Sequence, residues 1–172
     1  MVELADGRER GVRAAEFRTG SGLEFTVLVD RGMDIDRCDF KGIPIAWRSA
    51  TGSVHPAHFE PEGLGWLRSF FGGLLTTCGL TYAHHPTVDE GEELGLHGRI
   101  SNTPARNLQV DEHWEGDDFV MRLSGETAES MHFGPHMVLR RSVTARLGER
   151  RLTISDTVEN RGYRTEPLML LY

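Results

Sequence analysis

The 172-residue sequence is poor in cysteine: it contains only Cys38 and Cys78, which lie far apart. Neither has a second thiol at the short spacing that a zinc site requires. Isolated cysteines of this kind are typical of reduced, buried thiols in a cytoplasmic protein. The sequence therefore predicts a cytoplasmic location and gives no sign of a thiolate metal centre.

Long apolar runs and basic stripes are also missing. The longest apolar run, residues 168–172, is far too short to cross a bilayer, and residues 1–10 lack the apolar core of a signal peptide. The formal net charge is -7 with both signs interspersed, whereas nucleic-acid binders carry clustered basic residues. We therefore expect no membrane segment and no nucleic-acid partner.

Several common site motifs are absent as well. The chain has no Gly-x-Gly-x-x-Gly loop, no Gly-Lys-Ser/Thr phosphate loop and no Gly-x-Ser-x-Gly nucleophile elbow. It also lacks the His-x-His pair of cupin-type metal sites. These absences argue against a phosphate-binding loop, an α/β-hydrolase and a cupin.

What the sequence does have is period-two alternation and 20 glycines. Apolar and polar residues alternate in segments 23–30, 33–36, 119–124 and 152–155, and turn signals stand at 19–22, 41–42, 115–117 and 147–149. Half-buried strands joined by tight turns form antiparallel sheets. The pattern predicts an all-β sandwich or barrel, with residues 1–172 in a single domain.

The middle of the chain, residues 51–107, follows a different pattern. It has little alternation, several histidines and glycines and four prolines, and only Glu62–Phe70 has the pattern of a short helix. A long segment without strong periodicity inside a regular β chain usually carries function. We therefore expect the functional site in this segment.

The C-terminal segment Thr165–Tyr172 has the apolar pattern of a buried strand that stops in mid-run, whereas chain ends are usually polar. We therefore expect the protein to continue beyond Tyr172. A sandwich cut within a sheet leaves an unpaired apolar edge, so the 172 residues are expected to aggregate or dimerise when expressed alone.

The most distinctive candidate site is Leu94–Asn102, in which Gly95 and Gly98 bracket His97. The glycines allow backbone or ligand to approach an imidazole that exchanges protons near neutral pH. Arg99 supplies a donor fork that suits sugar hydroxyls or a carboxylate, and its charge favours a neutral His97. The alternative is a histidine that backbone groups satisfy within a glycine-rich turn.

A second candidate is Asp30–Ile35, which places Arg31 and Asp34 at the junction of two strands. Asp34 and Asp36 are predicted to share one face of their strand. If that face lines a cleft, Arg31 and Asp34 are placed to hold a polyhydroxy ligand. The alternative is a surface ion pair around a hairpin turn.

Other chemistry-bearing residues have simpler interpretations. Segment Gly72–Leu80 favours a buried strand entered through a glycine turn, and Cys78 has no adjacent base to activate it. The loop histidines invite a metal hypothesis, but their spacing fits solvated side chains better; they are His55, His58, His84 and His85. Large aromatic residues can stack on sugars but usually form the core of β proteins; here they are Trp47, Trp66 and Phe71.

Three motifs occur in order along the chain: Asp30–Ile35, Gly72–Leu80 and Leu96–Ala105. Together they resemble a bacterial subfamily of aldose 1-epimerase-like proteins, the DUF4432 domain, over nearly the whole chain. The resemblance implies a galactose mutarotase-like β-supersandwich and a reaction without a cofactor. In such enzymes a Glu base takes the anomeric proton while a His acid protonates the ring oxygen, so the ring opens and closes on its other face.

The resemblance implies that His97 is the first active-site histidine, and we predict it as the catalytic residue. The predicted substrate-binding residues are Arg31, Asp34, Arg99 and Asn102. The family's second histidine would follow a strand like Leu168–Tyr172, and its general-base Glu lies further downstream. The arginine-asparagine motif that precedes the histidine in mutarotases proper is not present, so the preferred sugar is not defined.

These features support functions of different classes. The first is an aldose 1-epimerase-like isomerase acting on a monosaccharide or sugar derivative, and the second is a sugar-binding module without chemistry. A third is a metal-dependent enzyme that uses the loop histidines. Because a positioned acid and base each contribute orders of magnitude to the rate, the 172 residues are expected to show no mutarotation above buffer. The sequence does not indicate the oligomeric state.

Overall fold

The computed structural model describes residues 1–172 as an antiparallel β-sandwich with four short 3-10 helices. The first sheet has five strands in the order β1-β2-β3-β4-β5, and all of its neighbouring strands are antiparallel. These strands are β1 (Val2–Glu3), β2 (Arg13–Arg18), β3 (Leu23–Leu28), β4 (Asp34–Phe40) and β5 (Ile43–Pro44). The predicted turns at 19–22 and 41–42 connect β2 to β3 and β4 to β5.

The second sheet has four longer strands in the order β11-β12-β13-β14. They are β11 (Arg106–Glu115), β12 (Asp118–Ser130), β13 (His136–Arg146) and β14 (Leu152–Asn160). The sheet is a meander of antiparallel hairpins, and the predicted turns at 115–117 and 147–149 lie at two of its connections. Residue pairs run without interruption along β12 and β13, from Val120 opposite Arg146 to Ser130 opposite His136.

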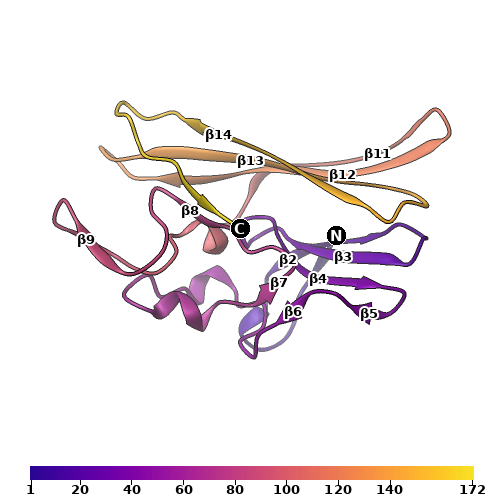
Figure 1. Cartoon of the computed structure of the whole chain (residues 1–172), viewed down its shortest axis with the longest axis horizontal. Helices are drawn as coiled ribbons and strands as arrows, with labels where there is room; N and C mark the ends of the chain where they lie inside the picture. Colours follow the sequence, from indigo (N-terminus) through magenta and orange to yellow (C-terminus); the bar gives the residue numbers. More distant parts are fainter.

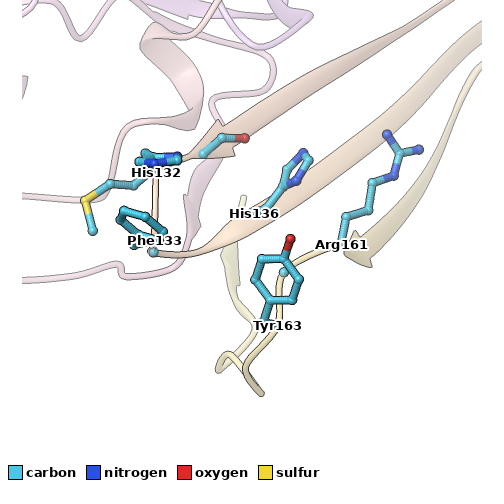
Figure 2. A pocket seen from close by; sticks show the side chains of 9 residues that line it. His132, Phe133, His136, Arg161 and Tyr163 are labelled. Carbon is cyan, nitrogen blue, oxygen red and sulfur yellow. The ribbon is translucent and has the colours of Figure 1, made fainter.

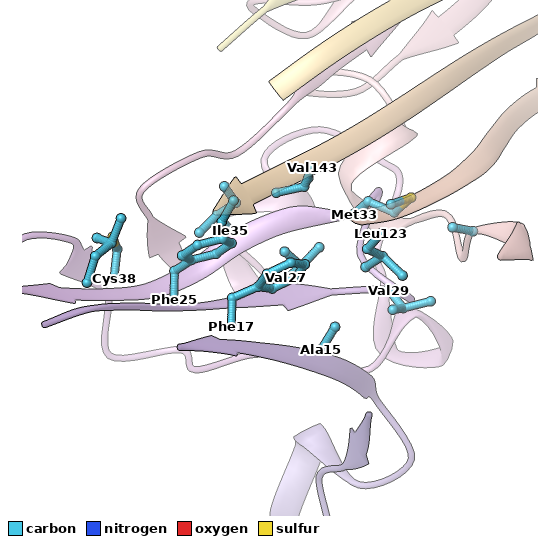
Figure 3. Packing of buried hydrophobic residues seen from close by; sticks show 13 residues of the cluster. Ala15, Phe17, Phe25, Val27, Val29, Met33, Ile35, Cys38, Leu123 and Val143 are labelled. Atoms are coloured by element: carbon cyan, nitrogen blue, oxygen red, sulfur yellow. The ribbon is translucent and has the colours of Figure 1, made fainter. Parts of the chain in front are cut away.

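The two sheets form two layers with an apolar core between them (Figures 1 and 3). Phe25, Val27 and Ile35 enter this core from the first sheet, and Leu123 and Val143 enter it from the second. All five are buried because alternate side chains of each strand point toward the other layer. The predicted antiparallel sandwich is confirmed.

The strand β4 departs from the predicted half-buried pattern. Asp34 and Asp36 were expected on a face open to solvent or a cleft, but both are buried. Asp34 accepts hydrogen bonds from Thr77 and Arg141, and Asp36 accepts from Arg48 and Ser53. Buried carboxylates need such partners, and period-two patterning carries no information about them.

The segment between the two sheets contains only short elements. They are β6 (Trp47–Arg48), β7 (Gly72–Gly73), β8 (Cys78–Leu80), β9 (Thr87–Asp89) and β10 (Glu92–Leu94), with helices η2 (Pro56–His58), η3 (Gly65–Arg68) and η4 (Ile100–Asn102). A further 3-10 helix, η1 (Gly7–Glu9), follows β1. The helix predicted at Glu62–Phe70 is therefore a single 3-10 turn. In Figure 1, β8 and β9 lie below the long sheet and to one side of the first sheet, whereas β6 and β7 lie against the first sheet near β4.

The C-terminal strand β15 (Met169–Leu171) pairs antiparallel with β8. Its prediction as a buried strand is wrong for the side chains: Met169 and Leu171 are exposed, and Leu170 is half-buried. None of the helical turns in the chain has the length and apolar character that a membrane crossing requires.

Candidate active site

His97 lies in the loop between β10 and η4, with its own backbone in the left-handed region at φ 58°. Gly98 is also left-handed, and a side chain there would collide with the carbonyl oxygens of Gly79 and Tyr82. A side chain at Gly95 would collide with the Pro61 carbonyl. The two glycines therefore let the loop pack closely against neighbouring backbone and hold His97 in a conformation that most residues avoid.

Backbone hydrogen bonds fix the His97 loop on both sides. His97 N–H donates to the His84 carbonyl at 3.0 Å, and the His97 carbonyl accepts from Gly79 N–H at 3.1 Å. Arg99 N–H in turn donates to the Gly79 carbonyl at 3.1 Å. The backbone N–H and carbonyl of His97 are thus both hydrogen-bonded, as expected for a histidine held in a glycine-rich turn. Its side chain is not satisfied, because the Nδ1 atom is buried and has no hydrogen-bond partner.

The His97 imidazole is half-buried and has a lowered pKa. Burial is the main cause, because it penalises the charged ring, and the neighbouring His84 and His85 add repulsion. The direction agrees with the prediction of a neutral imidazole, but the predicted cause does not. Arg99 is absent from the causes; its side chain instead donates to the Tyr82 hydroxyl at 3.4 Å.

An aromatic row leads from the surface to His97. Trp47 is 64% exposed, and its ring lies 6.0 Å from that of Phe70. Phe70 stacks on the buried Trp66 at 4.8 Å, and the Trp66 ring meets the His97 imidazole edge-on at 4.8 Å. Exposed and half-buried rings in line with polar groups suit the apolar face of a sugar. The expectation that large aromatics belong to the core is confirmed for Trp66 and Phe71 and is wrong for Trp47.

The predicted binding residues Arg99 and Asn102 flank the His97 loop. Arg99 is exposed, and its guanidinium lies 3.8 Å from the Glu92 carboxylate. Asn102 is buried; its side-chain amide donates to Ser101 Oγ at 3.3 Å, while its Oδ1 atom has no partner. Ser101 Oγ also accepts from the Trp66 indole at 3.1 Å. Two side chains therefore hold a buried polar atom without a partner, and Trp66 is linked to both. It contacts His97 directly and is connected to Asn102 through Ser101.

Arg31 is fully buried, and its guanidinium donates to three backbone carbonyls. These belong to Ser101 at 2.6 Å, Val54 at 2.7 Å and Ser69 at 2.9 Å. Burial lowers its pKa to about 10, although the nearby carboxylates of Asp34 and Asp36 oppose that shift. The three carbonyls lie in separate segments: Ser101 stands in η4 next to Asn102, Ser69 follows η3 next to Phe70, and Val54 precedes η2. Arg31 thus pins the loops around the site and directs no donor into it.

Asp34 has no exposed surface and bridges two parts of the fold. Its carboxylate accepts from Thr77 N–H at 3.0 Å, from Thr77 Oγ1 at 2.5 Å and from Arg141 at 2.8 Å. Burial raises the pKa of Asp34, and the charge of Arg141 and the bonds from Thr77 oppose that rise. Arg141, on β13, also holds Asp156 on β14. Sequence patterns give no signal for such a partner more than a hundred residues away.

Glu129 is a residue that sequence reasoning missed. From β12 its carboxylate accepts hydrogen bonds from Leu80 N–H at 2.8 Å, Thr81 N–H at 3.2 Å and the Thr81 hydroxyl at 2.8 Å. The preceding residue, Gly79, donates to the His97 carbonyl and accepts from Arg99 N–H. Glu129 therefore links the second sheet to the histidine loop, and only the fold shows this because the residues are distant in sequence.

Metal and thiol chemistry find no support in the arrangement of side chains. The chain contains no group of three or more His, Cys, Asp or Glu residues placed to hold a metal ion. Cys38 and Cys78 are free and buried. Burial raises the pKa of Cys78 to about 11, with a contribution from Asp34, so its thiol is protonated near neutral pH.

Two stacked antiparallel sheets and a glycine-flanked histidine loop beside them define a galactose mutarotase-like β-sandwich protein. The fold matches the crystal structure of a protein named "putative aldose 1-epimerase" from Klebsiella pneumoniae subsp. pneumoniae MGH 78578, with a TM-score of 0.86 and 26% sequence identity. The match covers 93% of this chain and 42% of that one, so the chain spans less than half the length of its structural relative.

A family model described as "Domain of unknown function (DUF4432)" matches residues 9–172. The chain belongs to the DUF4432 family. Comparison with curated proteins gives no match.

Proposed function

We propose that the site beside His97 binds a monosaccharide or sugar derivative, and that the protein interconverts sugar anomers as an aldose 1-epimerase does. The observation that carries this proposal is the His97 imidazole. It is half-buried at the end of an aromatic row, and its buried Nδ1 has no partner in the protein. Buried polar atoms are normally satisfied, and those that are not are candidates for ligand binding.

In the proposed reaction, His97 donates a proton to the ring oxygen of the sugar while a base removes the proton of the anomeric hydroxyl. The C1–O5 bond breaks, the carbonyl turns, and the reverse transfers close the ring on its other face. A lowered pKa makes the protonated imidazole a stronger acid toward the weakly basic ring oxygen. The same shift leaves a smaller fraction of the ring protonated near neutral pH, so the proposed acid step should become faster as the pH is lowered toward the pKa of His97.

The other predicted residues take different parts in the proposal. Asn102 Oδ1 and the Arg99 guanidinium are offered as hydrogen-bonding groups for sugar hydroxyls, because one has no partner and the other is exposed. Arg31 and Asp34 direct their polar atoms to partners inside the chain. We therefore propose that these two position the loops, in place of the direct sugar contacts predicted from the sequence.

A sugar-binding module without chemistry is the second candidate, favoured by one observation. Two carboxylates beside the His97 loop are already engaged, Glu92 by Arg99 and Glu129 by Leu80 and Thr81, so neither is a free general base for the anomeric hydroxyl. We expect the 172 residues to bind sugar without accelerating mutarotation. An experiment that distinguishes the isomerase from the binding module must therefore supply the general base from solution.

The first experiment measures binding. Galactose, glucose and related aldoses are titrated while the tryptophan fluorescence is followed, with His97→Ala and Trp47→Ala compared against His58→Ala, which alters an exposed loop histidine. We expect His97→Ala and Trp47→Ala each to weaken binding by about tenfold, and His58→Ala to leave it unchanged. Sugar affinity that is indifferent to both site variants would refute the site.

The second experiment measures chemistry. Mutarotation of glucose and galactose is followed by polarimetry in formate buffer, whose carboxylate serves as an external base. If His97 is a positioned acid, the protein accelerates the reaction above the same buffer, and His97→Ala abolishes the gain. If the chain binds sugar tightly but the mutarotation rate equals that of formate buffer alone, the chain is a sugar-binding module without chemistry.

A further inference from the structure

A hollow with a different lining lies at the end of the long sheet, between the β12–β13 hairpin and the segment that follows β14 (Figure 2). Its volume is about 330 Å³, which is within the range of small-ligand sites. It is lined by Ser130, Met131, His132, Phe133, Gly134, His136, Arg161, Gly162 and Tyr163. The lining shares no residue with the site described around His97, so the hollow stands independently of the function proposed above.

Two aromatic rings at this hollow are held in solvent. Phe133 is 86% exposed, and Tyr163 is fully exposed. Phe133 has a left-handed backbone at φ 63°, which is unfavourable for a bulky residue, and the His132 ring packs against it with a centroid distance of 3.9 Å. A hairpin tip gains no stability from a strained, exposed phenylalanine. Its ring is therefore a candidate for contact with a ligand.

The lining of the hollow supplies hydrogen-bond donors, and its one permanent charge, Arg161, is paired with carboxylates that lie outside the lining. The lining includes Arg161 and two histidines but no carboxylate, in a chain whose net charge is -7. Glu159 accepts from Arg161 Nε at 2.9 Å, and Glu126 lies 3.5 Å from its Nη2. These contacts hold the guanidinium in one orientation and leave Nη1 without a partner. A planar, oriented donor of this kind suits a carboxylate or phosphate.

The backbone around the hollow is already ordered. Met131 N–H donates to the Pro135 carbonyl at 2.9 Å across the hairpin tip, and Arg161 N–H donates to the His136 carbonyl at 2.8 Å. In the other wall, Gly162 N–H donates to Asn160 Oδ1 at 2.8 Å. In Figure 2, His136 lies between Phe133 and Arg161, and Tyr163 lies below it. The groups therefore surround one space without needing to rearrange.

We propose that this hollow binds a monosaccharide that carries an acidic group, a carboxylate or a phosphate. The sugar ring packs on Phe133 and Tyr163, and the oxyanion accepts hydrogen bonds from His136 and Arg161. The volume accommodates one pyranose with its acidic substituent. Aromatic rings give the apolar contact, and the oriented guanidinium distinguishes acidic from neutral sugars.

The test uses NMR of the 172-residue chain, with the ring signals of His136 as a reporter. The probes are glucuronate, glucose 6-phosphate, glucose and inorganic phosphate. We expect at least one acidic sugar to shift the His136 signals, with glucose and inorganic phosphate each about tenfold weaker or more. A response to glucuronate alone identifies a carboxylate ligand, and a response to glucose 6-phosphate alone identifies a phosphate ligand.

Variants connect the signal to the proposed contacts. Phe133→Ala and Tyr163→Ala alter exposed side chains and should each weaken acidic-sugar binding by about five- to tenfold. The matched control Trp114→Ala removes an aromatic ring that is 64% exposed on β11 and should change nothing. His97→Ala should also leave this affinity intact, which separates it from the proposed function. Unshifted His136 signals, equal response to inorganic phosphate, or full affinity in both aromatic variants would overturn the proposal.

Discussion

Two regions between the sheets are equally buried, but one is made of apolar side chains and the other of charged side chains. The first is the apolar core around Phe25, Val27 and Leu123, where Phe25 also stacks on Phe17 at 4.6 Å. The second is a charged layer of Arg31, Asp34, Arg141 and their partners. Apolar packing is non-directional and fixes the distance between the sheets, whereas hydrogen bonds to charged groups fix particular atoms. The comparison teaches that apolar packing holds the two sheets together, whereas the charged layer joins particular strands, β4, β13 and β14, and fixes the irregular loops around His97.

The largest expected effect comes from breaking the charged layer at Arg141. Replacing Arg141 with Ala leaves Asp34 buried with only Thr77 as partner and removes both bonds to Asp156. We expect the free energy of unfolding to fall by about 3–5 kcal/mol at neutral pH, measured by urea denaturation. The double variant Arg141→Met with Asp34→Asn removes both charges and should recover much of that loss.

The pH dependence sharpens this prediction. Burial already raises the pKa of Asp34 in the native chain, and loss of Arg141 raises it further. A carboxyl group whose folded pKa exceeds its unfolded value favours folding at low pH and disfavours it as the pH rises through the folded pKa. The deficit of Arg141→Ala should therefore shrink toward pH 4. A deficit below about 1 kcal/mol, or one that grows on acidification, would contradict this account of the charged layer.

The next effect separates stability from binding. Arg31→Met leaves three loop carbonyls without their donor, and Leu123→Ala opens a cavity in the apolar core. Each should lower the free energy of unfolding by about 3 kcal/mol. Only Arg31→Met should also weaken sugar binding at the His97 site, because Arg31 pins the loops that carry Phe70 and Asn102. Equal sugar affinities of the two folded variants would remove the distinction between the regions.

The same difference explains which features could be predicted from the sequence. Strands β3, β12 and β14 follow from local alternation, and the turns between β2 and β3, β11 and β12, and β13 and β14 follow from glycine signals, because neighbouring residues decide both. The segment 49–105 follows from no local pattern. One of its links to the first sheet, Arg31, donates to carbonyls 23, 38 and 70 residues further along the chain. Hydrogen bonds over such separations leave no periodic pattern in the sequence and cannot be predicted from it.

The candidate site was predictable only in part. The glycine-flanked His97 was found from its motif, and the structure places Arg99 in the same loop and Asn102 in the helix η4 that follows it. Glu129 and the unpaired Nδ1 depend on which elements meet in the fold, and the exposure of Trp47 depends on what covers it. Residue type at these positions carries none of that information. Arg31 and Asp34 were singled out for their charge, but burial directs that charge inward.

A smaller effect is expected at Glu129, which extends the charged layer toward the histidine loop. Glu129→Ala removes the acceptor for Leu80 N–H, Thr81 N–H and the Thr81 hydroxyl, and should lower the free energy of unfolding by about 1–3 kcal/mol. Glu129→Gln keeps one carbonyl oxygen for the amides and should lose less.

Because Gly79 joins this segment to His97, Glu129→Ala should also speed hydrogen exchange at the amides of Gly79 and Arg99 and weaken sugar binding. Glu129→Gln should restore both. If Glu129→Ala lowers stability but leaves exchange at Gly79 and Arg99 unchanged, Glu129 acts only on the sheet, and its link to the site is wrong.

The smallest effect is a change in the pKa of His97. Burial and the repulsion of His84 and His85 lower the pKa of His97 below its ordinary value of about 6.5. His97 therefore favours folding above a pH of about 6.5, and this contribution is lost as the pH falls through the folded pKa. His84→Asn removes one repulsive ring, keeps the carbonyl that binds His97 N–H, and suits the left-handed backbone at φ 82°. We expect the pKa of His97, measured by NMR titration, to rise but to stay below the ordinary value because burial remains. His113→Asn, on β11, should leave it unchanged; a pKa that does not move in His84→Asn would mean that burial alone tunes the imidazole.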